Sequence, residues 1–146
     1  MAVIKMAGHL IRRLHQQSTQ VFAQRTQEAG FDLTPVQYAA LDAIHACPGT
    51  DQSRVAEVIG YDRATIGGVI DRLEKKGWVS RTVSDVDRRA RVLTLTPEGD
   101  RIRLALEPIV EDLQKDILLP LSDAEQEFFV HLTRQVVQAT EPPRSE

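Results

Sequence analysis

The spacing of apolar residues is most regular between residues 51 and 99, where it predicts two short helices and then two strands. In the first helix, Val55, Val58 and Ile59 fall on one face. In the second helix, apolar residues recur at intervals of three and four, which assigns that face to the core. These residues are Ile66, Val69, Ile70 and Leu73.

Residues that cap or end helices mark the limits of these elements. Asp51 and Asp62 each stand where a carboxylate can accept hydrogen bonds from the free N–H groups of a first helical turn. Gly77 ends the second helix, and residues 78–82 and 91–95 then alternate with a period of two, as half-buried strands do. Helix, turn, helix and hairpin in this order predict a winged helix-turn-helix, a unit that commonly places one helix in the major groove of DNA.

The polar side of the second helix carries the candidate DNA contacts. Arg63 and Thr65 can form hydrogen bonds to bases or phosphates. Gly67 and Gly68 each cost a helix about 1 kcal/mol against alanine, which favours a compensating role such as close approach to base edges over mere tolerance. The predicted contacts on this segment are Arg63, Ala64, Thr65, Gly67, Gly68 and Arg72.

The hairpin tip at residues 84–90 is polar, and arginines are concentrated around it. Arg88, Arg89 and Arg91 fall within four positions. An arginine on a thin ribbon can enter a minor groove, where the negative potential favours it. Asp87 is placed to support the wing by holding Arg89 extended through a charge-assisted hydrogen bond. An ordinary solvated turn has a similar composition. The position of this tip beside the predicted recognition helix nevertheless favours a DNA contact.

Helical patterns flank this unit on both sides and leave apolar surface to be covered. Thr34-Pro35 and Thr96-Pro97 have the N-cap and first-turn residues of new helices, and Ser122 caps a last one. Two copies packed helix on helix would cover the apolar surface, and a monomer that folds these helices back on itself is the alternative.

We expect a mainly α fold with a small two-stranded β wing. The expected parts are an N-terminal dimerisation helix (1–32), the winged helix-turn-helix (33–100), C-terminal dimerisation helices (101–138) and a disordered tail (139–146).

Charge and composition refine this picture. The net charge of −3 argues at first against a polyanionic partner. Residues 51–103, however, hold eleven Lys or Arg against nine Asp or Glu, whereas the remainder holds seven against twelve. The local field governs docking, so DNA remains a suitable partner. A single cysteine, Cys47, and the absence of a signal peptide or membrane-spanning run predict a cytoplasmic protein without a membrane partner.

Three motifs resemble the MarR family of bacterial transcription regulators. LTPVQYAALDAI at residues 33–44 is similar to the family's helix before the DNA-binding unit, and RLEKKGWVSR at 72–81 to the end of its recognition helix and first wing strand. The D-x-R at 87–89 and the following VLTLTPEGD are similar to its wing. The resemblance covers roughly residues 5 to 138 and is specific from 33 to 100. It implies a homodimer that binds a pseudo-palindromic operator and is often released by a small ligand.

Residues near the N-terminus predict a site for a small acid. Arg12, His15 and Gln16 share a helix face, His9 lies one turn earlier, and Tyr38 lies on the next helix. The guanidinium fork matches both oxygens of a carboxylate. The chain resembles the MarR family, and some members of that family that respond to aromatic acids use an arginine and a histidine from this helix to bind the acid. We therefore predict a ligand site for a small aromatic carboxylate, and a solvated face or a contact with the partner subunit is the alternative.

Catalytic, metal and cofactor sites are not indicated. No two of the four histidines have the i, i+4 spacing of metal ligands on a helix, and neither a nucleophile pattern nor a phosphate loop is present. The expected function is a ligand-released repressor. A winged-helix module that binds protein instead of DNA, or a regulator without an effector, remains open, although Arg63 and the arginines of the tip favour DNA.

Overall fold

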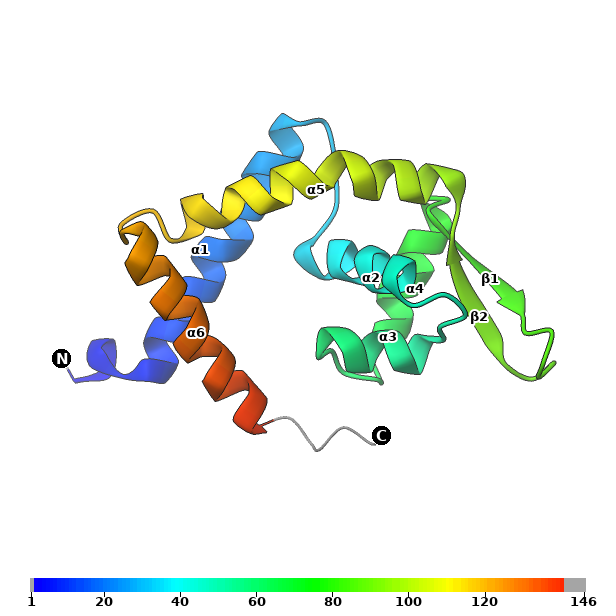
Figure 1. The fold of residues 1–146 in the computed structure, drawn as a ribbon, viewed down its shortest axis with the longest axis horizontal. Helices are drawn as coiled ribbons and strands as arrows, with labels where there is room; N and C mark the ends of the chain where they lie inside the picture. The colour runs from blue at the N-terminus through cyan, green and yellow to red at the C-terminus, as the bar shows by residue number, and fades with distance from the viewer. Residues whose placement is uncertain (1, 141–146) are drawn as a thin grey trace.

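The computed structural model describes residues 2–140 and is mainly helical with one small sheet (Figure 1). The elements are η1 (Val3–Lys5), α1 (Ala7–Glu28), α2 (Pro35–Ala46), α3 (Gln52–Ile59), α4 (Ile66–Lys75), β1 (Val79–Val83), β2 (Arg91–Leu95), α5 (Pro97–Ile117) and α6 (Asp123–Thr140). Helices α2, α3 and α4 gather beside the β1–β2 hairpin at one end of the molecule, α1 and α6 form an arm at the other, and α5 spans both (Figure 1). The predicted fold class is confirmed.

The main core lies where α2, α3 and α4 meet the hairpin. The predicted face of α4 is buried: Ile66, Val69, Ile70 and Leu73. On α3, Val55 is buried as predicted, but Val58 is 47% exposed. The buried arc of this helix runs from Val55 through Ile59 to Ala56, and Val58 lies beyond its edge.

Helix α4 begins later than the sequence predicts. The Asp62 carboxylate accepts a hydrogen bond from the Ala64 N–H at 3.3 Å, within a turn at residues 63–65. Regular helix starts at Ile66, after Thr65, which supplies no side-chain cap. A carboxylate that bonds within a preceding turn is no longer available to cap the helix itself. Arg63 therefore lies just ahead of the predicted recognition helix and not inside it.

The other predicted helix starts and the hairpin are confirmed. Side-chain oxygens of four residues accept hydrogen bonds from first-turn N–H groups: Thr34, Asp51, Thr96 and Ser122. Strands β1 and β2 are antiparallel, with Val79 opposite Leu95 and Val83 opposite Arg91. The connecting segment therefore projects from the compact unit as a wing (Figure 1).

Helix α6 is longer than predicted, and none of its residues is buried. It continues to Thr140, so residues 139 and 140 are helical and not part of a disordered tail. The rest of the predicted tail, residues 141–146, lies outside the described residues. Among residues 2–140, no helix is both long and apolar enough to cross a membrane.

The start of α5 lies unusually close to the start of the hairpin. A Cβ on Gly99 would stand 1.9 Å from the carbonyl oxygen of Trp78, which no real side chain allows. The same carbonyl accepts a hydrogen bond from the Thr96 N–H at 3.0 Å. Glycine is therefore required at this point for α5 to leave the sheet in its observed direction.

The far end of α5 is held by an ion-pair cluster with α1. Arg25 donates to Asp112 at 2.6 Å and to Asp116. The hydrogen bond from Arg25, together with its charge, holds the pKa of Asp112 below its usual value. These partners lie 87 and 91 positions apart in the chain. Sequence periodicity within one helix does not reveal such a contact.

We expect Gly99→Ala to lower the free energy of unfolding by about 1–3 kcal/mol, because the added methyl meets backbone and not a flexible side chain. The matched control is Gly68→Ala in α4, where a Cβ has nothing within 4 Å. This control should gain up to about 1 kcal/mol from helix propensity. Urea unfolding followed by circular dichroism measures both. Unchanged stability in Gly99→Ala would contradict the close approach.

Candidate nucleic-acid interface

The turn before α4 and the outer face of α4 place the predicted helix contacts on the surface. Arg63, Ala64, Thr65 and Arg72 are all exposed. The Thr65 hydroxyl is used locally, since it donates to the Asp62 carbonyl oxygen at 3.2 Å. It can still accept a hydrogen bond, while the arginines remain available as donors to an anionic partner.

The two glycines of α4 lie in different surroundings. Gly68 is exposed, and a Cβ there would meet open space. Gly67 is half-buried, and a Cβ there would lie 3.2 Å from Nε2 of Gln52 in α3. Packing between α3 and α4 therefore accounts for Gly67. Only Gly68 has the free surface that close approach to DNA requires.

The wing tip is a series of tight turns closed by short polar side chains. Ser84 Oγ accepts from the N–H groups of Val86 and Asp87, at 3.2 and 3.3 Å. Asp87 Oδ1 accepts from the Arg89 backbone N–H at 3.0 Å. The predicted contact between Asp87 and the Arg89 guanidinium is therefore absent, and Asp87 binds the backbone N–H of Arg89 instead. An aspartate side chain readily accepts from the N–H two residues further along the chain.

Five arginines on the α4 segment and the hairpin have guanidinium groups that form no ion pair within residues 2–140. They are Arg63, Arg72, Arg88, Arg89 and Arg91, and all are exposed. By contrast, five others each lie within ion-pair distance of an Asp or Glu: Arg25, Arg54, Arg81, Arg101 and Arg103. The unpaired group offers planar forks that suit phosphate and base edges.

Arg81 of β1 was not singled out from the sequence. Its Nη1 donates to Asp71 Oδ1 at 2.7 Å and lies 3.5 Å from Glu74 Oε2. Its Nη2 donates to Gln52 Oε1 at 3.0 Å. The strand period places residue 81 on the same side as the buried Val79, and this was the available signal for an inward-facing arginine.

A second arginine that the sequence did not reveal, Arg103, joins α5 to α2. It is only 5% exposed. Its Nε donates to Asp100 at 3.2 Å, and its Nη1 lies 3.8 Å from both Asp42 and Glu107. The acidic partners on α5 have helical spacing, but the contact with α2 depends on tertiary packing.

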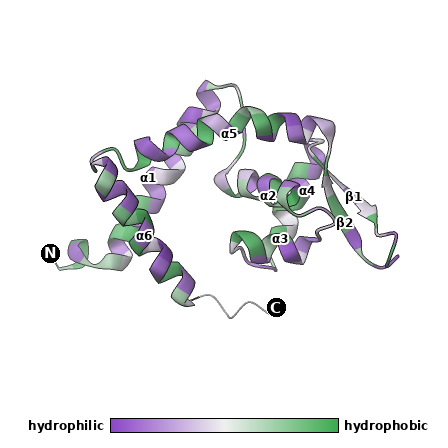
Figure 2. Cartoon of the chain, viewed as in Figure 1, coloured by the Kyte–Doolittle hydropathy of each residue, from purple (hydrophilic) through white to green (hydrophobic). Residues whose placement is uncertain are grey.

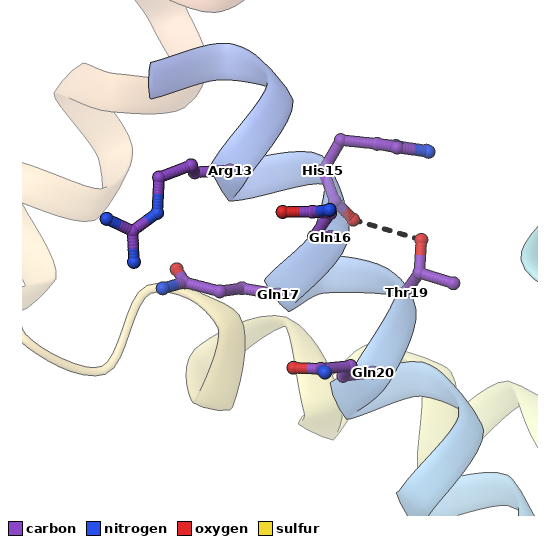
Figure 3. A pocket seen from close by; sticks show the side chains of 6 residues that line it. All are labelled: Arg13, His15, Gln16, Gln17, Thr19 and Gln20. Atoms are coloured by element: carbon purple, nitrogen blue, oxygen red, sulfur yellow. Dashed lines mark hydrogen bonds between the residues drawn. The ribbon is translucent and has the colours of Figure 1, made fainter. Parts of the chain in front are cut away.

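Of the predicted ligand residues of α1, Arg12 and His15 are exposed and His9 is half-buried, and they divide into two sets. Arg12 lies with His9, at 3.5 Å, and with Gln16, to which it donates at 3.3 Å. His15 instead borders a polar groove of about 530 Å³ along α1. Figure 3 shows the groove's lining side chains, which are Arg13, His15, Gln16, Gln17, Thr19 and Gln20. Gln16 is the residue that the two sets share.

Tyr38 contacts α1 further along the helix than Arg12 and His15. Its ring packs against Phe22 of α1, with the ring centroids 6.5 Å apart. Phe22 follows Arg12 by ten residues, or about 15 Å along a helix axis. Burial of Tyr38, and then the charge of Asp42, raises its pKa. A single chain therefore does not gather Arg12, His15 and Tyr38 into one pocket.

Comparison with known proteins matches this architecture to transcription regulators. A family model described as MarR family matches residues 31–90. Transcriptional regulator HosA of Escherichia coli O111:H- is 37% identical over 139 residues, which span 95% of this chain and 100% of HosA.

Solved structures extend the match to the whole fold. The PcaV transcriptional regulator from Streptomyces coelicolor, solved with its natural ligand, has 36% identity and a TM-score of 0.85, covering 95% of this chain and 96% of PcaV. Bordetella bronchiseptica BpsR, whose structure concerns regulation of DNA binding by 6-hydroxynicotinic acid, has 28% identity and a TM-score of 0.84, covering 92% and 94%. With similarity of this extent, and a winged helix-turn-helix that the family model overlaps, the chain belongs to the MarR family of transcription regulators.

Proposed function

We propose that this protein is a sequence-specific DNA-binding repressor that a small aromatic carboxylate releases from its operator. The observation that carries the DNA-binding part is the set of five arginines on the α4 segment and the hairpin whose guanidinium groups have no carboxylate partner within the described chain. BpsR, a similar protein, has its DNA binding regulated by 6-hydroxynicotinic acid, which is an aromatic acid.

The arrangement of these arginines fits a two-part contact with DNA. One face of α4 is buried in the core, so its opposite face is free to enter a major groove. Arg88 and Arg89 stand at the projecting tip of the wing, where a neighbouring minor groove would attract them. The helix would read bases, while the wing would add affinity and sense groove width.

We infer that the protein acts as a homodimer, because several large apolar side chains of the arm are exposed in the single chain. Along α6, Phe128 is 61% and Val136 is 66% exposed. Figure 2 shows hydrophobic segments along this helix among hydrophilic ones. The exposed apolar residues continue at the other end of the chain with Ile4, Met6 and Ile11. A second copy that packs on these helices would bury them. The two α4 helices of a binding-competent dimer would then stand about 34 Å apart, one turn of DNA.

Support for the effector comes from Arg12 and from the relatives. Within residues 2–140, Arg12 has no carboxylate partner, and with His9 and Gln16 it offers several polar groups to an acid. Since one chain does not enclose this cluster, the second copy would complete the pocket. A ligand lowers operator affinity only as far as it binds the DNA-free form better. A hundredfold effect requires about 2.7 kcal/mol of such difference, which is within the usual range of allosteric coupling.

Loss of either part of the interface should weaken DNA binding. Arg63→Ala is expected to cost about 1–3 kcal/mol and to relax base preference at one position, and Arg89→Ala should weaken binding without changing the fold. The control is Arg101→Ala, which removes the same charge from a residue paired with Glu98 on α5. Kd values are measured on a duplex that the parent selects from a random pool. Equal affinity for all four proteins would refute this interface.

Assembly should depend on α6. Phe128→Asp places a charge in the apolar stripe, and we expect it to shift the protein from dimer to monomer or aggregate, whereas Glu127→Ala on the same helix should remain dimeric. Light scattering after gel filtration measures the mass. A chain that ends at residue 122 should behave like Phe128→Asp. If that truncated chain stays a soluble dimer, α6 is not the interface.

An aromatic acid should stabilise the protein through Arg12. A thermal-shift panel that includes 6-hydroxynicotinic acid is run on the parent, on Arg12→Ala and on Arg13→Ala, whose side chain borders the neighbouring groove. We expect a raised Tm in the parent and in Arg13→Ala, and none in Arg12→Ala, since the guanidinium fork pairs with the carboxylate. The same shift in Arg12→Ala would exclude this residue from the site, and no shift with any acid would argue against the effector.

A further inference from the structure

Three separate elements meet at the side chain of Arg81. The guanidinium is half-buried, and its two Nη atoms reach Asp71 of α4 at 2.7 Å and Gln52 of α3 at 3.0 Å. Arg81 itself belongs to β1, the first strand of the wing. This set of three residues, here termed the clamp, therefore ties the wing to both helices of the helix-turn-helix.

The clamp also explains the glycine at position 67. A Cβ there would lie 3.2 Å from Nε2 of Gln52, closer than ordinary van der Waals contact. The other terminal atom of the same amide, Oε1, accepts the hydrogen bond from Arg81. A side chain at Gly67 would therefore press on Gln52 and disturb its bond to Arg81. The absence of a side chain at position 67 therefore preserves the bond that holds Arg81, and with it the wing, against α3.

Val79 and Leu93 are buried and anchor the base of the hairpin in the core, but the sheet has only two strands to support the wing beyond that base. A two-stranded hairpin is marginally stable unless it packs against other elements. By contrast, α4 is held by four buried residues whether or not Arg81 is bonded. Loss of the clamp would therefore change the angle of the wing more than the position of α4.

We propose that Arg81 is a positioning residue for DNA binding: with Gln52 and Asp71 it fixes the wing relative to α4, so that the wing-tip arginines reach DNA while α4 is in its groove. This inference rests on the proposed DNA-binding function. It assigns no DNA contact to Arg81 itself, whose two Nη atoms already bond to Asp71 and Gln52 within the protein. One Nη atom of Arg81 bonds to α4 and the other bonds to α3. The forked guanidinium suits two separate bonds of this kind better than the single ammonium of a lysine.

The test is a mutant cycle between Arg81 and Arg89, with Kd measured on the duplex that the parent selects from a random pool. Arg81→Ala alone should weaken binding about tenfold, because the wing is no longer held. In that background, the loss of affinity caused by Arg89→Ala should shrink by a factor of about three or more, because the tip already misses its groove. The effect of Arg63→Ala, at the α4 segment, should stay the same in both backgrounds.

The possible results separate the clamp from a general loss of stability. If the effects of Arg89→Ala and Arg63→Ala shrink together, Arg81 supports the whole unit and the positioning role is overturned. If the effect of Arg89→Ala is the same with and without Arg81, the clamp does not hold the wing. If the parent selects no DNA at all, the proposed function fails, and this inference fails with it.

A second cycle tests the part played by Gly67. Gly67→Ala should weaken DNA binding in the parent, and this loss should disappear in Gln52→Ala, where no amide is left to be displaced. Gly68→Ala is the matched control on the open side of α4, and its effect should not depend on Gln52. If Gly67→Ala weakens binding equally in both backgrounds, position 67 acts through DNA and not through the clamp.

Discussion

The close approach of Gly99 to the Trp78 carbonyl is the constraint on which the arrangement of the molecule depends. It fixes where α5 begins relative to the hairpin, and α5 is the element that runs from the DNA-binding unit to the arm (Figure 1). Further along, Arg103 joins α5 to α2 through Asp42, and Arg25 joins its last turns to α1. A close-packed helix held at three places transmits a displacement instead of absorbing it. A displacement of the arm would therefore be passed along α5 to α2 and to the start of the hairpin.

Features encoded by neighbouring residues were predictable from the sequence. The buried face of α4 and the caps at Thr34 and Thr96 each depend on residues a few positions apart. Two of these short-range predictions were nevertheless wrong. Asp62 closed a turn where a helix cap was expected, and Asp87 bonded to backbone where a side-chain partner was expected. Short polar side chains have both options within reach, and sequence spacing alone does not distinguish them.

Contacts between distant elements could not be read in the same way. The reach of Arg81 to Gln52 joins residues 29 positions apart, and that of Arg25 to Asp112 joins residues 87 apart. The sequence placed Tyr38 beside Arg12, and this prediction was wrong. Tyr38 does contact α1, but at Phe22 and not near Arg12. The sequence located the helices, but not the turn of one helix that packs on a given turn of the other. Crossing geometry depends on side-chain packing along both helices.

The exposure of α6 has a consequence for how the chain responds to its own concentration. None of the eighteen residues of this helix is buried in the single chain, and most of the stability of a protein helix comes from packing of its apolar face. If association covers it, ordering of the segment and pairing of subunits become one equilibrium. Occupancy of a two-fold DNA site would then vary with the square of the chain concentration when monomers predominate. Under the proposed function, a modest change in the amount of this protein would produce a disproportionate change in occupancy of its DNA site.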